Sequence, residues 1–172
     1  MEYVDNEYEF AFQFPQDWKV QRPPTQSDAG EVRVTVKHPT RPTYVMVTVG
    51  QIGKSITEDA FHQNRELISN SLIDFTVEMI YKRTSRDIDA ERIIIAEKRD
   101  IPSDVGIKFY IASLQITEDV PMTMAGIHVV PFDKPCIVAF LMITPASGEA
   151  TSDSDEITKV FNSFHMIGEK PE

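Results

Sequence analysis

The residues that most often carry catalysis or bind metals are few and scattered in this sequence. Histidine is common in both roles. The four histidines are His38, His62, His128 and His165. They share no spacing typical of a metal site, although His62 has Glu58 and Glu66 one helical turn to either side. That trio could hold a metal weakly, but an ion pair on a helix surface explains it better. We therefore expect no metal site and no cofactor.

Motifs for nucleophilic catalysis and phosphate binding are also missing. The sequence has no Gly-x-Ser-x-Gly elbow, and the segment Gly50-x-x-Gly53-Lys54-Ser55 is shorter between its glycines than the phosphate-binding loop. Cys136 is the only cysteine, which excludes an intrachain disulfide. It stands in an apolar run, which indicates a small buried side chain and not a reactive thiolate. We name no catalytic residue.

Two pairs of acids could do acid–base work, namely Asp87 with Asp89 and Asp153 with Asp155. Paired carboxylates act as acid and base only in a pocket that separates their pKa values. A turn accounts for the first pair and a helix N-terminus for the second. The pairs alone therefore do not predict an enzyme.

Methionine and tryptophan residues are the best candidates for contacts with a partner. Met122 and Met124 alternate on one predicted strand, and such flexible apolar side chains could bind a peptide or a lipid tail. The alternative for both is ordinary core packing. Trp18 follows a predicted strand end, where it either contacts a ligand or covers the end of the sheet. We name Met122, Met124 and Trp18 as candidate partner-binding residues.

The charge of the chain limits its partners. The formal net charge is −10, which repels a phosphate backbone and argues against nucleic-acid binding. Residues 1–18 hold five acids and residues 149–156 hold four, and neither segment contains Lys or Arg. An acidic patch could face a basic protein, although a solvated surface and a helix N-terminus also explain these clusters.

No targeting or membrane signal is visible. Met1 is followed by acids, without the basic start and apolar segment of a secretory signal. The longest apolar run is well short of the ~20 residues that cross a bilayer. We expect a cytoplasmic location by default, and an extracytoplasmic one if a signal peptide has been removed.

Hydrophobic periodicity predicts strands before a central helix. Alternation of apolar and polar residues indicates strands over 8–14, 32–36 and 44–51. Ser55 and Glu58 fit a capping box, which begins a helix that runs to about Leu72.

A second run of strands follows, and a helix closes the chain. The predicted strands cover 75–83, 91–98, 107–117, 121–130 and 136–144. Apolar residues then recur at helical spacing on one face of the last helix, at Ile157, Val160, Phe161 and Phe164.

The order of elements predicts an α+β fold in a single domain, residues 1–172, with an ordered core from about 7 to 167. Short connections between consecutive strands require antiparallel pairing. We therefore predict a twisted antiparallel sheet of about seven to nine strands with two packed helices.

Two landmarks resemble the Mog1/PsbP-like fold group, which includes the DcrB-related proteins. One is Phe12-Gln13-Phe14-Pro15-Gln16-Asp17-Trp18, and the other is Val160-Phe161-Asn162-Ser163-Phe164. With the mid-chain helix, the resemblance covers roughly residues 7–167. It implies a mostly non-enzymatic protein, because members are photosystem subunits, a partner of a nuclear-transport GTPase, bacterial lipoproteins and chaperone-like adaptors. It transfers no functional residue, since the matching positions are those that determine a fold.

Three functions therefore stay open. The first is a non-enzymatic binding or accessory domain that contacts another protein, in the manner of an adaptor or chaperone. The second is a carrier or sensor that holds an apolar small molecule between sheet and helix. The third is an enzyme whose site is assembled only in the folded chain. A homo-oligomer is compatible with each.

Overall fold

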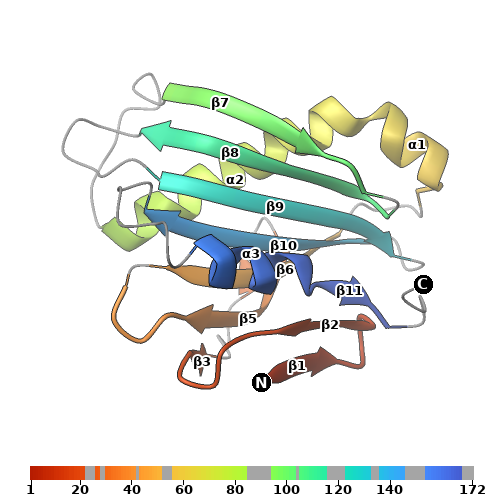
Figure 1. Ribbon diagram of the computed structural model, residues 1–172. Coiled ribbons are helices and arrows are strands. Elements are labelled where there is room, and N and C mark those ends of the chain that lie inside the picture. Colours follow the sequence, from red (N-terminus) through yellow and green to blue (C-terminus); the bar gives the residue numbers. More distant parts are fainter. Residues whose placement is uncertain are drawn as a thin grey trace.

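The chain folds into two antiparallel sheets with helices on both faces of the larger one (Figure 1). The structure is a computed structural model. It describes residues 1–21, 26–27, 30–41, 43–51, 56–84, 94–103, 105–115, 123–132, 136–145 and 154–167.

The main sheet has eight strands in the order β3-β5-β6-β10-β9-β8-β7, with β4 paired to β5. Its strands are β3 (Lys19–Gln21), β4 (Gln26–Ser27), β5 (Gly30–Lys37), β6 (Tyr44–Gln51), β7 (Ile94–Ile101), β8 (Ile107–Gln115), β9 (Thr123–Phe132) and β10 (Cys136–Pro145). The small sheet has the order β1-β2-β11. Its strands are β1 (Glu2–Asp5), β2 (Phe10–Gln13) and β11 (His165–Met166).

These pairings confirm the predicted α+β fold with an antiparallel sheet. The aromatic strand expected over 8–14 lies in the small sheet, however, and not in the main one. Its partners are β1, near the start of the chain, and β11, at residues 165–166, so the pairing with β11 is too distant in sequence for local periodicity to predict.

The helices are α1 (Glu58–Gln63), α2 (Arg65–Thr84) and α3 (Ser154–Asn162). The strand predicted over 75–83 is wrong, because α2 continues through it. Its alternating apolar residues suggested a strand, but no Gly or Pro interrupts 65–84, and nothing in the backbone stops the helix there.

The predicted start of the capping box, Ser55, was two residues too early. The N-cap of α1 is Thr57, which has an extended backbone and whose side-chain Oγ1 accepts the Ala60 N–H at 3.3 Å. Glu58 is the first helical residue. Ser55 lies outside the described residues.

The two faces of the main sheet build two cores, and β10 divides its side chains between them. One core lies under the small sheet and α3 and includes Val138 and Phe140. The other lies under α1 and α2 and includes Leu141 with Phe61. Figure 1 shows α2 behind the sheet and α3 in front of it. Burial on both sides explains the uninterrupted apolar run of this strand.

Aromatic rings join the small sheet and α3 to the main sheet. The Phe140 ring lies 5.2 Å from Phe12 of β2, 6.0 Å from Phe161 of α3 and 4.9 Å from Phe164, between ring centroids. These distances suit favourable aromatic pairs. One side chain of β10 thus contacts both elements that cover this face.

An ion-pair cluster fixes the other end of the small sheet. The Arg33 guanidinium on β5 binds Asp5 at 2.9 Å, Glu7 at 2.9 Å and Glu31 at 2.7 Å. Asp5 is buried, and its second oxygen also accepts the Glu7 and Tyr8 N–H groups. The carboxylate therefore holds the β1–β2 turn in shape and ties it to the main sheet.

The packing of α3 makes one direct prediction. Replacing Phe161 with alanine should lower the free energy of unfolding by roughly 3–5 kcal/mol, because the ring is fully buried and would leave a cavity. Leu67→Ala is the control, since that side chain is 67% exposed and should change stability by less than about 0.5 kcal/mol. Urea denaturation of both variants measures this, and an unchanged Phe161→Ala midpoint would show that α3 does not dock as described.

Candidate binding surface

The small sheet buries one face and exposes the other. Its register pairs Val4 with Ala11 and Ala11 with His165, so these residues share the outer face. Their neighbours Phe10 and Phe12 point inward and are fully buried. Val4, in contrast, is 44% exposed. An exposed apolar side chain at the middle of a strand is unusual enough to mark a contact surface when others lie near it.

A second exposed apolar side chain and two exposed acids lie on or next to the strands of the small sheet. Ile167 is 39% exposed, and its N–H donates to the Glu9 carbonyl at 2.6 Å. Glu2 is on the same face as Val4, and both Glu2 and Glu9 are exposed. Within the described ranges neither acid forms an ion pair, whereas Arg33 neutralises Asp5 and Glu7. We call the set Glu2, Val4, Glu9, Gln13, His165 and Ile167 the outer face.

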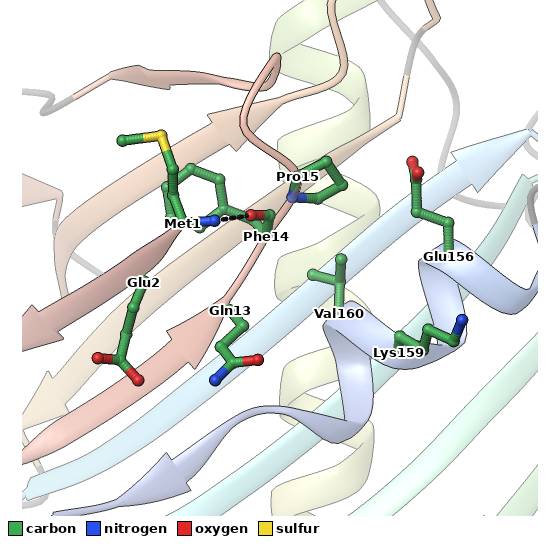
Figure 2. A pocket seen from close by; sticks show the side chains of 8 residues that line it. All are labelled: Met1, Glu2, Gln13, Phe14, Pro15, Glu156, Lys159 and Val160. Atoms are coloured by element: carbon green, nitrogen blue, oxygen red, sulfur yellow. Dashed lines mark hydrogen bonds between the residues drawn. The ribbon is translucent and has the colours of Figure 1, made fainter.

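A groove of about 420 Å³ continues from the outer face toward α3 (Figure 2). Glu2 and Gln13 belong to both. Figure 2 shows Glu156, Lys159 and Val160 of α3 across the groove from these two side chains. The remaining lining residues are Met1, Phe14 and Pro15. The groove has the volume of a ligand site, but it is open and mixes charged with apolar groups.

Hydrogen bonds hold α3 beside the small sheet. Ser163 Oγ accepts the Gln13 N–H at 2.8 Å and lies 2.7 Å from the Val160 carbonyl, to which it donates. Lys108 of β8 donates to Asn162 Oδ1 at 2.7 Å and lies over the Phe161 ring. Burial lowers the pKa of Lys108. The sequence landmark Val160-Phe161-Asn162-Ser163-Phe164 thus provides the contacts that dock α3.

Among the described residues, only His128 and His165 of the four histidines line the same pocket. His38 Nδ1 accepts the Thr40 and Arg41 N–H groups, His62 lies 3.7 Å from Glu58, and His165 Nδ1 donates to the Ser163 carbonyl. Cys136 is fully buried. No group of three metal-ligating side chains occurs in the part of the chain that is described. Asp87, Asp89 and Asp153 lie outside that part.

The predicted partner contacts fall in different environments. Met122 lies outside the described residues. Met124 is half-buried on β9, on the face that carries α3. Trp18 is 4% exposed, and its ring packs edge-on against His38 at 5.5 Å. Trp18 therefore covers the sheet end, which was the alternative to a ligand contact.

Val4, Glu9 and Ile167 were not identified from the sequence. The acids of residues 1–18 did indicate a charged segment. Val4 and Ile167 gave no separate signal, because only the pairing of β1, β2 and β11 brings them to one face.

Comparison with known proteins was made on both sequence and structure. No family model matches the sequence, and no curated protein matches it. Cyanobacterial PsbP (CyanoP) from Synechocystis sp. PCC 6803 has a similar structure, with a TM-score of 0.62 and 14% identity over 96% of this chain and 91% of that chain. The chain has a Mog1/PsbP-like fold. This confirms the resemblance seen in the sequence landmarks, and at this identity the likeness extends to the fold alone.

A more distant structure is the Ran-binding protein Mog1p of Saccharomyces cerevisiae. It covers 97% of this chain and 95% of its own, with a TM-score of 0.49 and 10% identity. This similarity is too low to support any inference about function. In the described residues, no helix is both long and apolar enough to span a membrane.

The buried histidine His128 on β9 should make the stability of the fold depend on pH. Burial lowers the pKa of His128 to about 4, the Val105 carbonyl opposes that shift, and the Lys108 charge adds to it. An unfolded chain binds this proton near pH 6.5. Between these values the unfolded state holds more protons, so the free energy of unfolding falls as the pH drops, by roughly 2–3 kcal/mol.

Denaturation at pH 7 and pH 4 tests this expectation. The wild type should lose more stability between the two than His128→Phe, which has no ring to protonate. His165→Ala should behave as the wild type, because His165 is exposed. Equal losses in the wild type and His128→Phe would contradict the assignment.

Proposed function

We propose that this chain is a non-enzymatic binding domain that docks a basic segment of another protein on its outer face. The observation that carries the proposal is the exposure of Val4 and Ile167, at 44% and 39%, beside Glu2 and Glu9. Protein interfaces commonly combine an apolar centre with a polar rim. The outer face has both parts.

The charge of this surface supports a basic partner. Glu2 and Glu9 lie at the rim without ion pairs in the described residues, and the whole chain carries a formal net charge of −10. Such a field raises the rate of encounter with a cationic segment and disfavours anionic competitors. Docking should therefore weaken as salt concentration rises.

The edges of the main sheet support docking less well. On β7, the exposed residues Lys98, Arg99 and Asp100 line the edge, and the register shifts between Ile95 and Lys98. Charges and bulges of this kind prevent strand addition. The opposite edge is β3, which has only three residues. A partner is thus better accommodated on a face than on an edge.

The two other functions have less support. An apolar carrier needs an enclosed apolar cavity, whereas the groove beside the outer face is open and lined in part by Glu156 and Lys159. An enzyme needs converging titratable groups, and in the described residues the largest such grouping of histidines is the pair His128 and His165, which line one pocket without an acid. Met124 on β9, on the face of the main sheet that carries α3, remains an alternative site for protein contact.

Charge reversal on the outer face tests the proposal. The double variant Glu2→Lys/Glu9→Lys should lose at least about tenfold in affinity for the partner, or ~1.4 kcal/mol. The control is Glu58→Lys/Glu66→Lys, which reverses two exposed acids on α1 and α2. Each double variant changes the formal net charge from −10 to −6, because each substitution adds two positive charges. Any difference between them therefore comes from position.

The measurement is quantitative affinity capture with wild-type and variant domains, after thermal denaturation has shown that each variant is folded. The wild type and the control should retain the same protein, and the outer-face variant should lose it. Equal retention by both double variants would contradict the proposal. Loss with Met124→Glu, but not with the outer-face variant, would place the contact on β9 instead.

A further inference from the structure

A second pocket of about 210 Å³ lies between the β7–β8 turn, strand β9 and the residues that follow α3. Val105, Val130, Phe164 and Met166 provide apolar walls, and Ser103, His128 and His165 provide polar groups. This pocket shares His165, but no acid, with the outer face and is separate from the groove of Figure 2.

His128 is the polar centre of the pocket. It is 7% exposed, and its Nε2 lies 2.9 Å from the Val105 carbonyl oxygen. A carbonyl only accepts, so Nε2 carries the proton and Nδ1 is left as an acceptor. In the described residues Nδ1 is buried and has no hydrogen-bond partner. Buried acceptors are rarely left unpaired. An external donor would satisfy this atom, and it reaches Nδ1 only if the side chains around the ring shift.

The turn that holds His128 is rigidly placed. Gly106 has a φ of +68°, and a Cβ at this position would lie 2.1 Å from the Val129 carbonyl oxygen. Only glycine permits so close an approach to β9. This close approach places the Val105 carbonyl oxygen within hydrogen-bond distance of His128 Nε2. Ser103 Oγ donates to the same carbonyl at 2.7 Å. The orientation of the imidazole is therefore fixed before any ligand enters.

The charge state of His128 suits an acceptor role. Burial lowers its pKa to about 4, so the ring is neutral near pH 7 and Nδ1 keeps its lone pair. Neutral imidazole could also bind a metal. His165 lines the same pocket, but the described residues hold no group of three metal-ligating side chains.

We propose that this pocket binds a small neutral molecule that has one O–H or N–H group on an otherwise apolar body. The O–H or N–H donates to His128 Nδ1, and the body packs against Val130 and Phe164. The site shares His165 with the outer face, but none of the exposed apolar side chains or acids that carry the proposed protein docking.

Phenol and toluene form a matched pair of probes, since they have similar size and only phenol donates a hydrogen bond. Nitrogen NMR of the ¹⁵N-labelled full chain at pH 7 reports the His128 ring directly. Phenol should shift the Nδ1 signal saturably and leave Nε2 as the protonated nitrogen. Toluene should bind about tenfold more weakly and leave Nδ1 unchanged. Absence of a saturable Nδ1 shift with phenol, as expected if only water enters the pocket, would overturn the proposal.

Two variants separate the His128 contact from general apolar binding. His128→Phe should reduce phenol binding to the level of toluene, whereas His62→Ala, on the exposed surface of α1, should leave it unchanged. Equal phenol binding by His128→Phe and the wild type would also overturn the proposal. If His128→Phe does not fold, the Nδ1 signal of the wild type decides the question alone.

Discussion

The contact of Phe140 with three other phenylalanines is the interaction on which the rest of the structure depends. Phe12, Phe161 and Phe164 come from β2, from α3 and from the turn after it, and each meets the Phe140 ring. Full burial of such a ring contributes roughly 1.5–3 kcal/mol, and each aromatic pair adds about 0.5–1.5 kcal/mol. Polar contacts then orient the small sheet and α3. Arg33 binds Asp5 at one end of the small sheet, and Ser163 accepts the Gln13 N–H at the other.

This arrangement decides which surfaces remain for binding. The main sheet has an α1–α2 core on one face and the small sheet with α3 on the other, so its central strands are internal. In the described residues, the small sheet packs on the main sheet with the side that faces Phe140, and on its other side the small Ala11 side chain is buried while Val4 is exposed. Its outer face is therefore presented on a rigid support, which reduces the entropy lost when a partner binds.

The hydrophobic pattern within a single segment was enough to predict some strands of the main sheet. Strand β6 matches its predicted range, Tyr44–Gln51, and β10 is apolar on both faces because both faces are covered. The helical residues 75–84 were assigned to a strand, since their alternating apolar residues fit both the strand period and the helix period, and packing decides between the two.

The small sheet could not be predicted, because its register joins residues such as Ala11 and His165 that are far apart in the chain. The same separation hid Val4 and Ile167, whereas the acids near the start of the chain were visible in the composition of that segment. Trp18 was a candidate contact on residue type alone, and its burial follows from the sheet end that it covers.

A photo-crosslinking residue at position 4 tests most directly whether the outer face meets a partner. Val4 is 44% exposed on β1, an edge strand of the small sheet. Leu67, which is 67% exposed on α2, the helix behind the main sheet, is the matched control position. Irradiation of cells that express each substituted chain, followed by gel analysis, reports what lies against each side chain. We expect one discrete, salt-sensitive crosslinked species from position 4, with a basic segment of another protein at the crosslink, and none from position 67. No product from position 4, or the same products from both positions, would contradict a docking role for the outer face.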